Sequence, residues 1–207
     1  MDQATISEIV KFLKESLNPV HAAISLEGEP TLYPRLSELI KAFYNHGFKT
    51  VFLVSNGTSP QVLQKLDVEP SQLYISLCAP NEEIYKKTCR PMVTDAWEKV
   101  MESLEVLNSF NCPTVLRHTL IPKLNMTNVE EYAKLALKAN STYLEPKAAM
   151  SVGAARNRFS YEEMARHSEI KDFAIELSKS SGYDIIDEQW QSCIVLLSKL
   201  KKPKVLY

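Results

Sequence analysis

The residues best suited to chemistry in this sequence begin directly after the apolar run Val20–Leu26, in the segment Glu27-Gly28-Glu29-Pro30. A glycine at such a point lets a ligand approach the backbone, and the proline restricts the chain that leaves the run. Carbonyls of this segment can accept hydrogen bonds from a ligand ammonium group, and a carboxylate of Glu27 or Glu29 adds charge. A tight loop whose acids are simply hydrated fits these residues equally well.

Two further apolar runs end in small polar groups. Ser55-Asn56-Gly57-Thr58 follows a run at 49–55, and Ser76 stands near the end of Leu73–Cys78. The amide of Asn56 can bind a small polar ligand, and the hydroxyl of Ser76 can meet a ribose or a carboxylate. An ordinary turn at Asn56-Gly57 and a serine bonded to the backbone remain the alternatives.

Charged residues interrupt two other apolar runs. Arg117 lies within VLRHTLIP, and Glu145-Pro146-Lys147 within the next run. A buried charge without a partner is strongly destabilising, so Arg117 needs either a ligand carboxylate or a structural acid such as Glu145. Lys147 can bind an anion or a substrate carbonyl, and an internal pair with Glu145 is the alternative.

Basic residues and cysteines give weaker indications. The basic residues form clusters that are suited to phosphate but equally typical of solvated faces: Lys86, Lys87 and Arg90, then Arg156 and Arg158, then the segment 199–204. The four cysteines, Cys78, Cys89, Cys112 and Cys193, are far apart in the sequence and include no C-x-x-C pair. We therefore expect structural thiols rather than a metal site.

Periodicity predicts the elements that position these residues. Five apolar strands alternate with helical patterns, and two further strands close the chain; the predicted strands are 20–26, 49–55, 73–78, 114–121, 142–147, 183–187 and 193–198. Right-handed crossovers make such a sheet parallel. We expect an α/β fold, a partial (β/α) barrel in preference to an open doubly wound sheet, forming one domain over residues 1–207. Both architectures place sites at the carboxyl ends of strands.

Composition excludes some classes of function. The formal net charge of -1 argues against a globally basic nucleic-acid binder. No apolar run reaches the roughly 18 residues that a membrane span needs, so we expect no membrane contact. The acidic first residues do not look like a signal peptide, and the separated cysteines fit a reducing compartment. A cytoplasmic protein is expected.

Several long phrases of the sequence resemble one enzyme family. ISLEGEPTLYPRLSELI, FLVSNGT, QLYISLCAPNEEIYKK, RHTLIPKLNMTN and EPKAAMSVG resemble the radical S-adenosylmethionine (SAM) enzymes that make 4-demethylwyosine in tRNA. The likeness runs from about His21 to Ser198. It implies a partial barrel whose first strand lies upstream, with a short strand pair at the carboxyl terminus.

The resemblance also implies a reaction and its participants. The family condenses N1-methylguanosine at position 37 of phenylalanine tRNA with pyruvate, using SAM that a [4Fe–4S] cluster cleaves. By position, Gly28, Glu29 and Pro30 would flank the methionine of SAM. Asn56 and Ser76 would contact the cofactor, Arg117 would pair with its carboxylate, and Lys147 would line the substrate side.

Departures from the family pattern allow three interpretations of what this chain does. The cluster cysteines are absent, as is the lysine that captures pyruvate, and Cys78 stands where aspartate is expected. The chain is then the SAM- and substrate-binding part of an enzyme, inactive alone, whose cluster comes from an N-terminal segment or a partner chain. A degenerate SAM- or tRNA-binding homologue, and a radical SAM enzyme with another substrate, are the alternatives.

Overall fold

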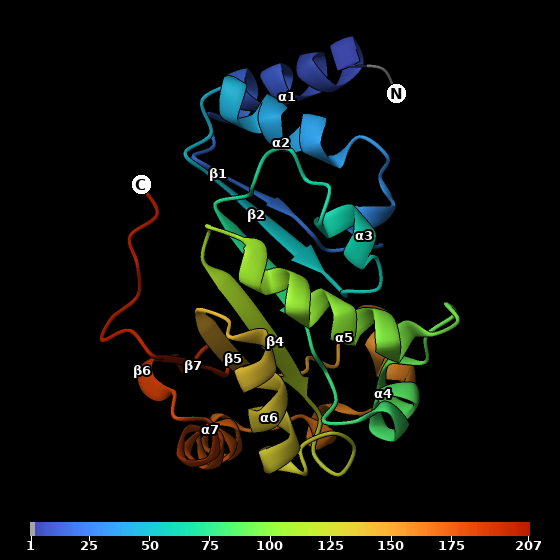
Figure 1. The fold of residues 1–207 in the computed structure, drawn as a ribbon, viewed down its shortest axis with the longest axis vertical. Helices are drawn as coiled ribbons and strands as arrows, with labels where there is room; N and C mark the ends of the chain where they lie inside the picture. Colours follow the sequence, from blue (N-terminus) through green and yellow to red (C-terminus); the bar gives the residue numbers. More distant parts are fainter. Residues whose placement is uncertain (1–2) are drawn as a thin grey trace.

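The structure, a computed structural model, describes residues 3–207 and contains one seven-stranded sheet (Figure 1). The strands lie in the order β1-β2-β3-β4-β5-β7-β6. Their bounds are β1 His21–Ile24, β2 Thr50–Ser55, β3 Gln72–Ser76, β4 Thr114–Leu120, β5 Tyr143–Ala148, β6 Asp184–Gln189 and β7 Ile194–Ser198. The first five strands are parallel, and β7 pairs antiparallel with both β5 and β6.

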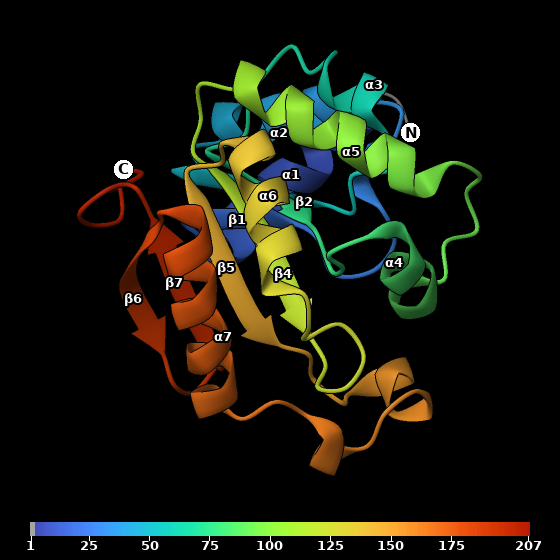
Figure 2. The same ribbon diagram turned by 60° about the horizontal axis from the view of Figure 1, so that its bottom comes forward.

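Helices connect the parallel strands and pack on the outside of the sheet (Figures 1 and 2). They are α1 Gln3–Leu17, α2 Leu36–Asn45, α3 Pro60–Leu63, α4 Glu82–Cys89, α5 Ala96–Val106, α6 Val129–Ala139 and α7 His167–Ser181, with 3-10 turns η1 Pro30–Leu32, η2 Leu107–Ser109, η3 Gly153–Asn157 and η4 Tyr161–Glu163. The described part of the sheet does not close, because β1 and β6 each have one neighbour. The predicted partial (β/α) barrel with a terminal strand pair is confirmed.

Burial alternates along the central strands, and this alternation defines two faces. Leu53 of β2, Leu73 and Ile75 of β3, and Leu116 of β4 are fully buried beneath the helices. Apart from Val115, which is also buried, the residues next to them are only half-buried, so the opposite face is partly open. An apolar run such as that at 20–26 is typical of a strand covered on both faces, and this expectation is wrong here, because in β1 only Ala22 is buried.

Two helices depart from their local sequence signals. A capping box such as Ser160–Glu163 is typical of a helix start, but here it caps only the turn η4, and α7 begins at His167. Helix α4 has a mostly polar sequence without a strong apolar stripe. Its beginning is fixed by Asn81, whose Oδ1 accepts a hydrogen bond from Ile84 N at 3.0 Å, the usual role of asparagine at a helix N-cap.

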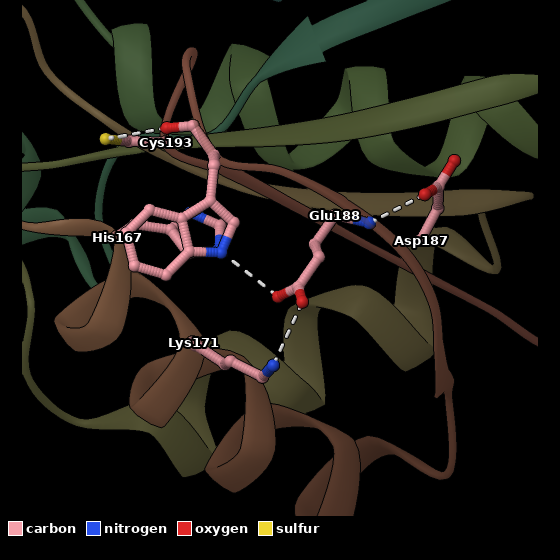
Figure 3. A network of polar contacts seen from close by, with 6 residues as sticks. His167, Lys171, Asp187, Glu188 and Cys193 are labelled. Carbon is pink, nitrogen blue, oxygen red and sulfur yellow. Dashed lines mark hydrogen bonds and ion pairs between the residues drawn. The ribbon is translucent and has the colours of Figure 1, made fainter.

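The terminal hairpin is attached to α7 by a polar network (Figure 3). Glu188 of β6 accepts a hydrogen bond from Lys171 Nζ at 3.0 Å and lies 3.1 Å from His167 Nε2. The His167 ring also packs on Trp190, with ring centroids 4.7 Å apart. The lysine and then the histidine hold the pKa of the Glu188 carboxyl below its usual value. Across residues 3–207, none of the helices is both long and apolar enough to cross a membrane.

Candidate functional site

The open face of the sheet carries the polar residues that the sequence singled out. Its half-buried side chains stand at alternate positions of β2 to β5 and continue past the strand ends: Phe52, Val54, Tyr74, Ser76, Cys78, Arg117, Thr119 and Lys147. Register places Ser76 opposite Arg117, Arg117 opposite Glu145, and Thr119 opposite Lys147. We call these residues, with Glu145, the inward face. The structure therefore brings the site residues of three neighbouring strands together.

Glu29 joins the loop after β1 to the end of β2. Its Oε1 accepts hydrogen bonds from Thr31 N at 3.1 Å, Thr31 Oγ1 at 2.8 Å and Ser55 Oγ at 2.7 Å. Its Oε2 accepts one from Asn56 N at 2.7 Å. Both carboxylate oxygens of Glu29 are thus hydrogen-bonded within the chain, and they hold Asn56 at the carboxyl end of β2.

The segment before Glu29 is exposed and has an unusual backbone. Leu26 has φ +92° and a 98% exposed side chain, and Gly28 has φ +78° with open space where a Cβ would stand. A positive φ is costly for a leucine, and such strain gathers at functional sites. Gly28 is exposed, whereas the carbonyls of Glu29 and Pro30 accept backbone hydrogen bonds from Leu32 N and Tyr33 N, each at 3.0 Å.

Asn56 and Gly57 form a tight turn after β2. Asn56 Oδ1 accepts hydrogen bonds from Thr58 N at 2.9 Å and Thr58 Oγ1 at 2.7 Å. The Nδ2 donors of Asn56 have no partner within the described chain, and the residue is exposed. Gly57 is required here: its φ is +76°, and a Cβ would stand 3.1 Å from Ile75 Cγ2.

Arg117 has an internal partner. Its Nε donates to Glu145 Oε1 at 2.6 Å, and its guanidinium lies 4.4 Å from the ring centroid of Tyr74. The Glu145 side chain is 9% exposed and the Arg117 side chain 25%. Burial first, and then the Glu145 charge, raise the pKa of Tyr74 to about 12. The sequence left two partners open for Arg117, a ligand carboxylate or a structural acid, and the structure shows the structural acid, Glu145.

Lys147 and Ser76 have no such partners. Within residues 3–207, Lys147 makes no hydrogen bond or ion pair, although its side chain is half-buried. The Ser76 hydroxyl is likewise without a partner in that part of the chain. An unneutralised ammonium group and a free hydroxyl on the inward face are suited to an anionic or carbonyl-bearing ligand. Of the two internal pairs left open as alternatives for Glu145, the one with Arg117 forms and the one with Lys147 does not.

The sequence did not single out two residues of this face, Tyr74 and Thr119. Tyr74 precedes Ser76 by two positions, and Thr119 follows Arg117 by two. Because alternate residues of a strand share a face, this spacing was the signal that identifies both.

The basic clusters are mostly neutralised or engaged. Lys87 Nζ lies 2.6 Å from Glu83 Oε1, and Lys86 pairs with Glu82. Arg158 of the η3 segment donates to Thr88 O at 2.5 Å, so this segment reaches α4 (Figure 2). In Figure 2 the segment passes beyond the carboxyl ends of β4 and β5, where it borders the inward face.

A groove of about 1000 Å³ lies elsewhere, between α6 and α7. Its lining is strongly acidic and includes Glu130, Glu131, Glu169, Asp172 and Glu176. It is on the outer, helical side of the sheet and includes none of the predicted site residues. The predicted site residues and this acidic groove are therefore on different faces of the sheet.

The described residues do not fit an iron–sulfur cluster. A [4Fe–4S] cluster is held by cysteine thiolates, and no group of three His, Cys, Asp or Glu residues within 3–207 is arranged to hold a metal. By contrast, the exposed Gly28 turn, the free donors of Asn56 and the Ser76 hydroxyl fit a polar ligand such as SAM.

Comparison with known proteins identifies the fold. Residues 1–136 match the family model of the Radical SAM superfamily, and residues 138–199 match that of wyosine base formation. This chain belongs to the radical SAM superfamily. The predicted resemblance is confirmed by both matches.

The relatives come from one group within the superfamily. The S-adenosyl-L-methionine-dependent tRNA 4-demethylwyosine synthases of Pyrococcus horikoshii and Methanocaldococcus jannaschii are 44% and 41% identical, over 91% and 90% of this chain. The matches cover 56% and 58% of those relatives, so the chain spans little more than half their length.

Solved structures agree with the sequence matches. A structure of TYW1 with a lysine-pyruvate adduct bound superposes with a TM-score of 0.80 at 37% identity, covering 95% of this chain and 66% of that one. A crystal structure of archaeal TYW1 gives 0.73 at 34% identity, covering 95% and 67%. The inward face therefore lies in a radical SAM fold of the TYW1 type.

Proposed function

We propose that this chain is the SAM- and substrate-binding part of a tRNA-modifying enzyme that converts N1-methylguanosine-37 of phenylalanine tRNA and pyruvate to 4-demethylwyosine. The observation that carries the proposal is the inward face: polar groups of three strands, among them the unpartnered Ser76 hydroxyl and Lys147 ammonium group, converge in a fold whose relatives are tRNA 4-demethylwyosine synthases. Classification as a carbon–carbon lyase, and the cytoplasm as its place of action, belong to the same proposal.

In this proposal the residues at the ends of β1 to β4 bind SAM. Gly28, Glu29 and Pro30 flank the methionine, whose ammonium group the exposed Gly28 carbonyl receives, while the Glu29 carboxylate holds Asn56 in place. Asn56 and Ser76 donate to the remaining polar groups of the cofactor. The Nη groups of Arg117, whose Nε is bonded to Glu145, face the methionine carboxylate. SAM, when bound, supplies the radical chemistry of the superfamily.

Lys147 acts on the substrate side. An unpaired ammonium group orients a carboxylate or carbonyl oxygen, as pyruvate offers, and stabilises negative charge that develops there. Its position opposite Thr119 places it at the carboxyl end of the sheet. A relative's structure contains a lysine-pyruvate adduct; in our proposal that adduct-forming lysine comes from the segment or partner chain that also supplies the cluster, and Lys147 assists.

Nucleoside analysis of the cells that carry this chain tests the proposal. Deletion of the coding sequence should cause N1-methylguanosine to accumulate at position 37 of phenylalanine tRNA, with loss of the tricyclic base, as measured by mass spectrometry of the digested tRNA. Re-expression of the chain should restore the base, and the Lys147→Met variant should restore little. An unchanged nucleoside profile after deletion would refute the proposal.

A second experiment tests whether the cluster comes from elsewhere. Anaerobic incubation of this chain alone with iron and sulfide should give no [4Fe–4S] signal, because residues 3–207 lack a suitable ligand group. A cluster that forms and supports release of 5′-deoxyadenosine from SAM would overturn this part of the proposal.

A further inference from the structure

The guanidinium group of Arg117 is held on two sides by the chain itself. Its Nε donates to Glu145 Oε1 at 2.6 Å, and the Glu145 side chain is almost fully buried. Its Cζ lies over the ring of Tyr74, 4.4 Å from the ring centroid. Glu145 therefore fixes the Nε edge of the planar group, while Tyr74 covers one of its faces.

Two donor groups of the same side chain remain free. Among residues 3–207, Nη1 and Nη2 of Arg117 have no hydrogen-bond partner, and the side chain is partly exposed. Two such parallel N–H groups match the two oxygens of a carboxylate. Because Glu145 already balances the charge of Arg117, recognition at this edge depends on the direction of the N–H groups more than on net charge.

Tyr74 reaches Arg117 diagonally across two neighbouring strands. Register places Arg117 of β4 opposite Ser76 of β3, and Tyr74 precedes Ser76 by two positions on the same face. The Tyr74 hydroxyl has no hydrogen-bond partner within residues 3–207, so the contact with Arg117 is made by the ring. Burial, followed by the Glu145 charge, raises the pKa of Tyr74 to about 12. The phenol is thus neutral at physiological pH and does not compete with a carboxylate for the guanidinium.

The ring removes a freedom that the ion pair leaves. A guanidinium bonded only through Nε can still turn about that bond, and its Nη groups then point in several directions. Stacking over an aromatic face favours one plane. A donor edge that is fixed before the ligand arrives binds it with a smaller loss of conformational entropy.

We propose that Tyr74 is a positioning residue that fixes the plane of the Arg117 guanidinium, so that the free Nη edge selects ligands that carry a carboxylate. This role rests on the proposed function, in which the carboxylate belongs to the methionine part of SAM. Tyr74 acts through Arg117, and the ring rather than the hydroxyl is the part that acts.

Lys147 is the other cation of the inward face that is able to receive this carboxylate. It stands two positions after Glu145 on β5 and has no ion pair within the described residues. An ammonium group attracts an anion as a point charge, so its affinity does not depend on the ring of Tyr74. The two cations therefore predict different responses to a change at Tyr74.

Calorimetric titration of the whole chain with SAM and with its decarboxylated analogue tests this role. The ratio of the two Kd values is the decisive quantity, because a general loss of structure weakens both ligands alike. We expect the wild-type chain to prefer SAM by about tenfold or more, since hydrogen bonds to a charged group are missing from the analogue. Tyr74→Phe should keep this ratio, and Tyr74→Leu should lower it by about three- to tenfold.

The variants are matched in charge and in the loss of a ring. Tyrosine, phenylalanine and leucine are all uncharged at neutral pH, so long-range attraction of either ligand stays the same. Phe43→Leu removes another half-buried ring, which packs on Phe48 with ring centroids 4.9 Å apart on the helical side of the sheet. This control should leave the ratio unchanged.

The possible results separate this role from the proposed function. Absence of SAM binding by the wild-type chain would overturn the proposed cofactor site and this role with it. SAM binding with an unchanged ratio in Tyr74→Leu would overturn this role alone. A ratio that falls with Lys147→Met and not with Tyr74→Leu would also overturn it, and would assign the carboxylate to the ammonium group.

Nitrogen-15 spectra of the wild-type chain decide the matter if Tyr74→Leu does not fold. The guanidinium protons of Arg117 should be shifted upfield by the Tyr74 ring, both with and without SAM. Addition of SAM should move the Nη signals of Arg117, and the decarboxylated analogue should not. Loss of the upfield shift on SAM binding would show that the guanidinium leaves the ring, and would overturn the proposal.

Discussion

Replacing Arg117 by methionine should destabilise the fold by removing the partner of Glu145. The Glu145 side chain is 9% exposed, and Arg117 Nε is the donor that reaches its carboxylate, at 2.6 Å. Breaking a buried ion pair by truncating one partner costs about 3–5 kcal/mol. Because the Arg117 side chain is itself 25% exposed, solvent reaches the site and we expect the lower end, about 3 kcal/mol.

The reverse change should cost less. Glu145→Met leaves Arg117 stacked on Tyr74, at 4.4 Å from the ring centroid, and partly in contact with solvent. We expect a loss of about 1 kcal/mol, since a cation over an aromatic ring keeps a favourable contact. The double variant leaves neither charge unpaired and should lie within about 1 kcal/mol of the wild type, because apolar replacements of an ion pair are often neutral.

Urea unfolding of the four proteins, followed by circular dichroism, measures this cycle. The expected coupling between the two positions is about 3–5 kcal/mol, with unchanged slopes against denaturant. An Arg117→Met variant within about 0.5 kcal/mol of the wild type would refute the reasoning. In that case Arg117 would be free for a ligand, and the ion pair would contribute little.

Three other changes have defined expectations. Gly57→Ala should cost about 2–3 kcal/mol in denaturant unfolding, because a left-handed φ is joined by the 3.1 Å approach to Ile75; Gly28→Ala, with open space, should cost only about 1–2 kcal/mol. Equal losses would contradict this. Burial lowers the pKa of His118 to about 4. The free energy of unfolding should therefore be highest above the unfolded pKa of about 6.5 and should fall by about 3 kcal/mol as the pH drops toward 4. His118→Phe should flatten that part of the profile, and an unchanged slope would argue against it. Lys147→Met should leave the Tm unchanged or higher while abolishing base formation; a large drop in Tm would indicate a structural role.

The reason for the His118 effect is its incomplete hydrogen bonding. Nδ1 donates to Leu77 O at 2.9 Å, while Nε2 is buried without a partner among the described residues. Protonation at Nε2 would therefore place a charge in an apolar environment beside the Tyr132 ring, whose centroid lies 4.9 Å away.

The sequence predicted the strands well because their signal is local. Apolar runs at 49–55, 73–78 and 114–121 correspond to β2, β3 and β4 within a few residues. Which faces of the strands are exposed was harder to predict. The apolar run at 20–26 suggested burial on both sides, yet β1 is an edge strand with one buried residue. Burial depends on which helices cover a strand, and hydrophobicity alone does not report it.

Helix boundaries are hard to predict where a helix-capping motif is followed by only one turn. The Ser160–Glu163 capping box is satisfied by a single 3-10 turn, after which Met164 is extended and α7 starts afresh at His167. Helix α4 was missed because its polar residues Glu82, Glu83, Lys86 and Lys87 conceal a weak apolar stripe. Their pairing at a spacing of four positions was the available signal.

For the site, the alternation of residues along each strand predicted which side chains share a face. Contacts between residues far apart in the sequence could not be predicted. Ser76, Arg117 and Lys147 were placed correctly on one edge of the sheet because each occupies an alternate position near a strand end. The contacts of Glu29 with Ser55 and Asn56 depend on how the loop after β1 meets the end of β2. No spacing rule predicts these contacts, and only the structure shows that the Glu29 carboxylate is bonded to them.

Titration of this chain with SAM, followed by amide chemical shifts in solution, tests the assignment of the inward face most directly. We expect the largest shifts at Gly28, Asn56, Ser76 and the residues around Arg117, and we expect Asn56→Ala to weaken binding. Shifts confined to the acidic groove between α6 and α7, or no shifts at the ends of β1 to β4 at saturating SAM, would contradict the assignment of the inward face as the cofactor site.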